Sequence, residues 1–289
     1  MANETRPAGG GAPAGVGAGA SSPGAGSPGA GSPGAGVRRR PMRRGLSVAG
    51  IAAVAFAGLT AVSWITHSQD SVTVDERVDR VEIDISSGRV EIVGSPSGET
   101  RLDFSVKSGW SRDGGIDHAV SGGVLRVTGG CDSGVFPGIW CESDVTITVP
   151  ASASVTADAS AGTLVVSGLS GETSLTSDAG SIEVSDQRGP LTVHSAAGSV
   201  RVTGLDADVV KATSSAGDVE ISAVSPPRSL DAESSAGSVL VSLPTDVSYD
   251  VETDSAVGRE LVTVDSVPGA RHEVRAFSSA GAVEVTGRR

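Results

Sequence analysis

The chain has 289 residues, with 34 acidic and 22 basic side chains and a formal net charge of −12. Six of the basic residues and one acidic residue precede position 45, so residues 45–289 carry 16 basic and 33 acidic side chains, a net charge of −17. So acidic a region repels phosphate backbones, which argues against nucleic acid and anionic polymers as partners held by charge.

The first 44 residues have the composition of a disordered tail. Residues 1–36 are almost entirely Gly, Ala, Pro and Ser, and Ser-Pro-Gly-Ala-Gly repeats from Ser22, Ser27 and Ser32. This composition buries too little apolar surface to offset the entropy of ordering the chain. An arginine cluster follows at 38–44. We expect residues 1–44 to form a disordered cytoplasmic tail.

Residues 45–66 contain no charged side chain and are rich in Ala, Val, Leu and Ile. A helix of this length, at about 1.5 Å per residue, is long enough to cross a bilayer. The arginines before it predict a cytoplasmic N-terminus and an extracytoplasmic remainder, that is, a single-pass protein of the plasma membrane. The alternative is a cleaved signal peptide, because Ala61-Val-Ser63 loosely fits a cleavage site. Residues 67–77 are expected to be a linker.

The region from residue 78 to residue 150 contains short runs of alternating apolar residues, which predict β-strands. The expected strands are Arg80–Ile85, Arg89–Val93, Arg101–Val106, Val124–Thr128 and Asp144–Val149.

Two cysteines, Cys131 and Cys141, bracket an apolar loop that contains Phe136 and Trp140. Two cysteines outside the membrane are expected to form a disulfide, and closing so short a loop stabilises the fold by ~3 kcal/mol in the chain-entropy model. Phe136 and Trp140 have two interpretations. They either cover the end of the domain or form an exposed contact surface.

A Ser-Ala-Gly motif recurs through the rest of the chain. Gly162, Gly180, Gly198, Gly217 and Gly237 are 18, 18, 19 and 20 residues apart. A last copy at Gly281 follows after 44 residues, with a degenerate copy, Asp254-Ser-Ala-Val-Gly258, in the gap. A fixed period near 20 residues is typical of a solenoid built from stacked units.

The apolar pattern changes parity at each of these glycines. Apolar or small residues lie seven, five and three positions before the glycine, and aliphatic residues lie two and four positions after it. An unbroken strand cannot do this, so we expect two strands per coil, joined by a corner at the glycine. The predicted fold is therefore an all-β solenoid, or β-helix, with coils of roughly 18–21 residues.

Two details follow from stacking such coils. The Ser three positions before the glycine should bond to backbone groups of the corner. The outward residues Glu183, Arg201 and Glu220 should form a ladder of alternating charge on strands about 4.8 Å apart.

Motifs of catalysis are absent from the sequence. It has neither the H-E-x-x-H pattern of zinc proteases nor the G-x-S-x-G pattern of serine hydrolases. We expect no catalytic, cofactor-binding or metal-binding residue, and hence no enzyme. A carbohydrate-active enzyme on a β-helix is an alternative, because carboxylates are abundant.

Three segments and the coils that follow them carry a resemblance to a known family. They are Val81-Glu-Ile-Asp-Ile-Ser-Ser-Gly-Arg-Val-Glu-Ile92, Gly-Gly-Val-Leu-Arg-Val127 and Asp144-Val-Thr-Ile-Thr-Val-Pro150. In this order they resemble the bacterial putative adhesin family, a domain of unknown function, over about residues 78–287. The resemblance implies a β-solenoid of the bacterial cell envelope, often membrane-anchored, and supplies no catalytic residue. The cysteine loop and the long tail depart from the family pattern.

The expected function is therefore a membrane-anchored adhesin or surface scaffold with a non-catalytic extracellular solenoid and a cell-surface or envelope partner. One alternative is an envelope-stress sensor or regulator whose tail and arginines engage a cytoplasmic partner. The carbohydrate-active enzyme is the other.

Overall fold

The computed structural model describes residues 67–108, 114–131 and 141–288. Within these ranges the chain forms twenty β-strands and no helix. The expected disordered tail at 1–44 and transmembrane helix at 45–66 lie outside the described residues. No described segment forms a helix that could span a bilayer. Strand β1 (His67–Val74) occupies most of the segment 67–77 that was expected to be a linker.

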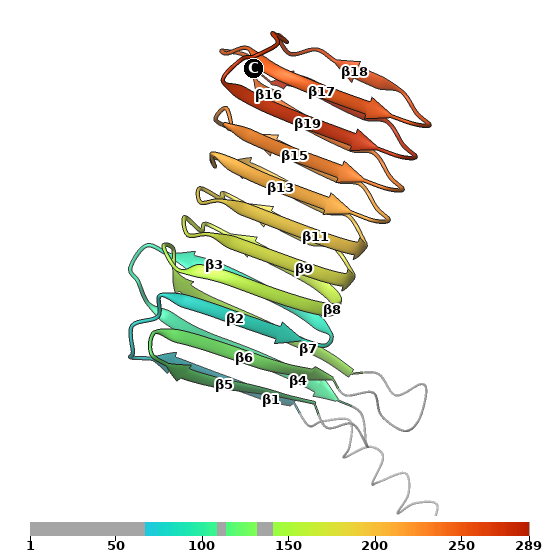
Figure 1. Cartoon of the computed structure of the whole chain (residues 1–289). Helices are drawn as coiled ribbons and strands as arrows, with labels where there is room; N and C mark the ends of the chain where they lie inside the picture. Colours follow the sequence, from blue (N-terminus) through green and yellow to red (C-terminus); the bar gives the residue numbers. More distant parts are fainter. Residues whose placement is uncertain (1–66, 109–113, 132–140, 289) are drawn as a thin grey trace, which may run out of the picture. The chain divides into compact units, whose positions relative to one another are not determined.

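The strands form two sheets, sheet A and sheet B, which are the two sides of a stack of coils (Figure 1). Sheet B contains, in spatial order, β5 (Gly114–Ser121), β6 (Val124–Cys131), β2 (Arg80–Ile85), the first half of β8 (Ser154–Ser167), β9 (Thr173–Ala179), β11 (Leu191–Ala197), β13 (Val209–Ser214), β15 (Ser229–Ser234), β19 (His272–Ser278) and β17 (Tyr249–Ser255). All neighbours are parallel except β5 and β6.

Sheet A has the same construction. Its spatial order is β1, β4 (Thr100–Ser108), β7 (Cys141–Pro150), β3 (Gly88–Ser95), the second half of β8, β10 (Ile182–Ser185), β12 (Val200–Leu205), β14 (Val219–Ala223), β16 (Val239–Pro244), β20 (Val283–Arg288) and β18 (Glu260–Val262). Only β1, β4 and β7 are joined by antiparallel pairing. The predicted all-β solenoid is thus confirmed. The sequence pattern missed β5.

The corner glycines adopt a backbone conformation that other residues rarely reach. Gly217 has a φ of 148°, and a Cβ added to it would lie closer than 3.0 Å to the carbonyl oxygen of Gly198 in the preceding coil. The same contact recurs from coil to coil along the stack. Because the backbones touch at the corners, only glycine fits there.

The parity change predicted at the corner is confirmed by burial. Val210 and Ala212 before Gly217, and Val219 and Ile221 after it, are each at most 1% exposed. The predicted serine bonds are confirmed in most coils. Thus Ser214 Oγ donates to Gly198 O at 3.0 Å, and equivalent bonds are formed by Ser195, Ser234, Ser255 and Ser278. The interior is therefore a thin layer of aliphatic and small side chains, closed by a serine ladder.

At both ends the spatial order of the coils departs from their order in the chain. The coil of β2 and β3 lies between that of β6 and β7 and the coil of β8. The final coil, β19 and β20, lies between β15 and β16 on one side and β17 and β18 on the other (Figure 1). This accounts for the interval of 44 residues before the last motif: Gly281 stacks directly on Gly237, and Gly258 lies outside it.

The outermost coil at the C-terminal end is held by a tyrosine. Tyr249, the only tyrosine in the chain, is fully buried, and its hydroxyl donates to Pro244 O at 2.9 Å. Its ring meets His272 edge-on, with centroids 5.9 Å apart. Burial, with a smaller contribution from the charge of Asp246, raises the pKa of Tyr249 to about 12. Tyr249 therefore ties β17 to the coil of β16 and to the inserted β19.

Candidate binding surface

The residues that the sequence suggested as a site are only partly described. Cys131 ends β6 and Cys141 begins β7, but their side chains lie outside the described part of the structure. Phe136 and Trp140 fall within 132–140, which is also outside it. The disulfide and the aromatic contact surface therefore stay predictions.

The interior of the described residues consists mainly of buried aliphatic and small side chains. Its largest polar side chain, Gln187, is fully buried and bonds through Nε2 to Gly171 O at 3.0 Å and Gly189 O at 3.1 Å. In the described ranges no three His, Cys, Asp or Glu side chains come together in a way that could hold a metal ion. The outer faces of the two sheets carry rows of polar and charged side chains.

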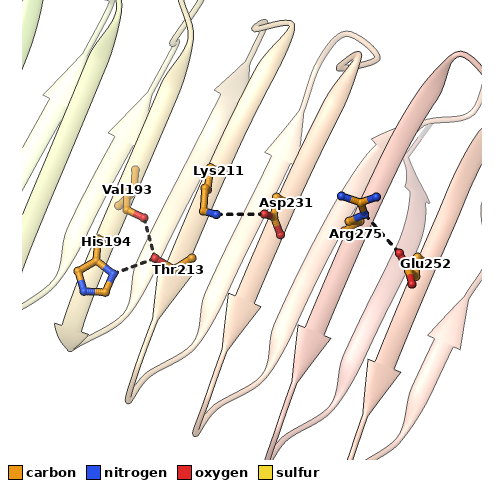
Figure 2. Close-up of polar contacts among 7 residues, drawn as sticks. All are labelled: Val193, His194, Lys211, Thr213, Asp231, Glu252 and Arg275. Carbon is orange, nitrogen blue, oxygen red and sulfur yellow. Dashed lines mark hydrogen bonds and ion pairs between the residues drawn. The ribbon is translucent and has the colours of Figure 1, made fainter.

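The outer face of sheet B is lined by polar side chains that contact one another across strands (Figure 2). His194 Nδ1 lies 2.9 Å from Thr213 Oγ1, which in turn lies 3.3 Å from Val193 O. Which of His194 and Thr213 donates in their contact depends on the imidazole tautomer.

Ion pairs continue this face toward the C-terminal end (Figure 2). Lys211 Nζ lies 3.4 Å from Asp231, and Arg275 Nε lies 3.3 Å from Glu252. Arg275 Nη2 also lies 2.7 Å from Glu273 Oε1. Exposed pairs of this kind contribute roughly 0–1 kcal/mol each. Their main effect is that the charges of this face compensate one another.

The outer face of sheet A carries the predicted charge row. Glu183, Arg201 and Glu220 lie side by side on β10, β12 and β14, which confirms their register. The ion pair, however, forms only between Arg201 and Glu220, at 2.5 Å. Leu240 on β16 then interrupts the row and remains 38% exposed. Beyond it Glu284 on β20 pairs with Arg259 at 2.9 Å.

A second row on sheet A consists of hydroxyl side chains, one on each of six successive strands from β8 to β20. We call it the hydroxyl row, and it contains Ser167, Ser185, Thr203, Ser222, Ser242 and Thr286. Neighbouring members are paired in register except Thr203 and Ser222, because the pairing of β12 with β14 shifts between Val202 and Leu205. Each of these residues lies five positions after a corner glycine. The signal is present in the aligned sequence, where a Ser or Thr recurs five positions after the corner glycine.

The two rows border a groove of about 150 Å³ over β14, β16 and β20. Glu220, Leu240 and Glu284 line it along one row, and the hydroxyls of Ser222, Ser242 and Thr286 line it along the other. Ile221 and Val241 also line it, although both are buried. The groove places one exposed aliphatic side chain beside carboxylates and hydroxyls, and it is smaller and more polar than most small-molecule sites, which have volumes of roughly 300–1,000 Å³.

Comparison with known proteins identifies the fold family. A family model described as Toastrack DUF4097 matches residues 72–286. No curated protein matches the chain.

Solved structures of similar proteins include one named as a putative cell adhesion protein from Clostridium sporogenes, which is 12% identical with a TM-score of 0.38 and covers 77% of this chain and 100% of its own. A putative adhesin from Bacteroides fragilis is 18% identical with a TM-score of 0.32, covering 76% and 98%. A protein from Parabacteroides distasonis named as a putative lipid binding protein is 9% identical with a TM-score of 0.42, covering 76% and 97%. Similarities at this level say nothing about what this chain binds.

Proposed function

This chain belongs to the Toastrack DUF4097 family, and from that premise we propose that it is a non-catalytic cell-envelope protein whose solenoid presents an extended outer surface for adhesion or scaffolding. The observation that supports this most directly is the regular arrangement of the outer faces. One residue per coil adds to each row, so that the hydroxyl row continues over six strands. A surface built in this way suits a long or repetitive partner better than a small substrate.

The placement of ionisable groups in the described ranges also favours binding over catalysis. The carboxylates of the two outer faces are exposed or part-exposed, and several are paired with Arg or Lys. Acid–base catalysis usually needs a carboxyl or imidazole whose pKa is shifted by burial or by a like charge. We therefore propose no enzymatic role, no cofactor and no nucleic-acid partner.

For localisation we propose a single-pass plasma-membrane protein, with residues 1–44 in the cytoplasm and the solenoid outside. The uncharged segment 45–66 and the arginines before it support this orientation. Protease added to intact cells should then digest the solenoid while an epitope placed before residue 36 stays protected. Recovery of the solenoid in the culture medium, free of membranes, would favour the cleaved signal peptide.

Adhesion is tested with cells that produce the full chain. They should adhere to envelope material from other cells more strongly than cells without the chain, and purified full chain added in solution should compete. A variant lacking residues 2–36 should adhere equally well, provided that it is displayed at the same level. If this deletion abolishes an envelope phenotype while display persists, the sensory alternative is preferred. Release of sugars from cell-wall polymer by the purified chain would establish an enzyme instead.

A further inference from the structure

The groove on sheet A has a chemical character that narrows its ligand. Leu240 is an exposed apolar side chain between two carboxylates, because it occupies the position on β16 that pairs with Glu220 on β14 and with Glu284 on β20. Its exposed fraction of 38% is well above that of the neighbouring inward residues. An apolar surface framed by hydrogen-bond acceptors suits a ligand with one apolar face and donor groups at its edge.

The acceptors of the groove are fixed in place by the protein. Arg201 holds Glu220 at 2.5 Å and Arg259 holds Glu284 at 2.9 Å, from opposite ends of the groove. Each carboxylate therefore keeps a compensated charge and retains free lone pairs for a neutral donor. A hydroxyl group of a ligand, which donates one hydrogen bond and accepts others, matches such a wall without adding charge.

The remaining wall can both donate and accept. Ser242 Oγ and Thr286 Oγ1 lie 3.3 Å apart, and Arg288 Nη1 donates to Ser222 Oγ at 2.8 Å. The arginine reaches from β20 across β16 to β14, where it contacts the groove residue Ser222. Arg288 forms no ion pair with any described residue, and its other nitrogens can donate to a ligand oxygen.

The net charge restricts the ligand further. Residues 45–289 carry a net charge of −17, from 16 basic and 33 acidic side chains. An acidic polymer would be repelled by this field as it approached the solenoid. A neutral ligand would not, and its binding would depend on hydrogen bonds and apolar contact.

We propose that the groove and the hydroxyl row bind a neutral polysaccharide, whose chain runs across the strands of sheet A with one sugar ring over Leu240. Sugars have the required chemistry: hydroxyls at the ring edge and an apolar C–H face. Except at the register shift between β12 and β14, the hydroxyl row repeats once per coil, about every 4.8 Å, a spacing close to the length of one residue in an extended chain of hexopyranoses. This proposal rests on the surface-binding function above and adds to it the ligand class and the position.

The test uses the purified full chain and insoluble polymers as probes. The probes are cellulose and chitin, which are neutral, and calcium alginate, which is acidic. Ser242→Arg fills the groove with a long side chain, and Ser174→Arg places the same substitution at a part-exposed serine on the outer face of sheet B. We expect the full chain to bind a neutral polymer, Ser242→Arg to weaken this by about tenfold or more, and Ser174→Arg to leave it unchanged. Leu240→Ser, which removes the apolar side chain without filling the groove, should also weaken binding.

Added salt should leave binding to the neutral polymer nearly unchanged, since surface electrostatics are screened by salt while hydrogen bonds and apolar contacts are not. Equal binding by the full chain and by correctly folded Ser242→Arg and Leu240→Ser would overturn the position of the site. Binding to alginate alone, or to none of the polymers, would overturn the ligand class. If either result is found while cells that produce the chain still adhere more strongly than cells without it, the proposed adhesion function stands and only the ligand proposal fails. If cells that produce the chain adhere no more strongly than cells without it, the adhesion function itself is refuted.

Discussion

Replacement of the corner glycine Gly217 by alanine should destabilise the solenoid by more than the backbone strain of a non-glycine residue alone. At a φ of 148° a non-glycine residue is strained by about 1–3 kcal/mol. The added Cβ would also lie closer than 3.0 Å to the carbonyl oxygen of Gly198, so the two coils must separate. Overpacking of this kind costs about 1–3 kcal/mol more. The expected loss is therefore ~2–6 kcal/mol in the free energy of unfolding.

Gly269 provides the matched control for this substitution. It also has a positive φ, 79°, but nothing lies within 4 Å of the position of its Cβ. Gly269→Ala should therefore cost only about 1–2 kcal/mol, from backbone strain. Urea unfolding of the two full-chain variants, followed by circular dichroism, measures the difference. Equal midpoints for Gly217→Ala and Gly269→Ala would refute the argument that touching coil backbones require glycine at the corner.

Three further predictions concern the C-terminal coils and the surface pairs. In a spectrophotometric titration the single tyrosine, Tyr249, should ionise near pH 12 instead of pH 10, because burial favours its neutral form. Since the pKa of Tyr249 is raised in the folded chain, the stability that it contributes is complete below about pH 10 and is lost as the pH rises toward 12. Removal of residues 272–289 deletes β19 and β20, which lie between the outer coil of β17 and β18 and the coil of β15 and β16, so the outer coil should detach. Tyr249 should then titrate near pH 10, and a titration that remains near pH 12 would contradict the observed coil order. Arg275→Ala should change the free energy of unfolding by less than about 1 kcal/mol even though it removes the pair with Glu252, and a larger loss in high salt would show that the residue acts through packing instead.

The local architecture of the coils could be predicted from the sequence because each coil repeats the same physical constraints. The parity change at the glycine, the inward serine and the register of Glu183, Arg201 and Glu220 all depend on neighbours within one or two coils. The ion pair between Glu183 and Arg201 does not form, because Arg201 pairs with Glu220 instead. The repeat fixes which residues are adjacent, but not which of two adjacent carboxylates an arginine selects.

The order of the coils at the two ends could not be predicted in this way. A coil inserted between two others satisfies the same periodic pattern as a coil added at the end. The degenerate copy at Gly258 is what an outermost coil would show, because such a coil has a neighbour on one side only and needs to bury fewer residues. All three residues of β18 are exposed. What decides the order is the packing of residues distant in sequence, such as Tyr249 against His272.

The candidate binding surface was only partly accessible from the sequence. The hydroxyl row is a column of the aligned repeats and needed no structure. The groove did need it, because Glu284 and Thr286 line it only through the pairing of β20 with β16, across 44 residues of sequence. The groove residues come from separate coils, and they are adjacent only because the last coil is inserted beside β16. The repeat pattern does not determine where in the stack that coil lies.

The interleaved ends also restrict how such a protein can change in length during evolution. From β8 to β16 each coil follows its predecessor both in sequence and in space. A duplicated coil inserted there would keep every corner, every row and both ends intact. A coil duplicated at either terminus would have to enter a slot that is already closed on both sides. Relatives of different length should therefore differ in the number of their middle coils, and a longer relative would carry a longer hydroxyl row on an unchanged pair of ends.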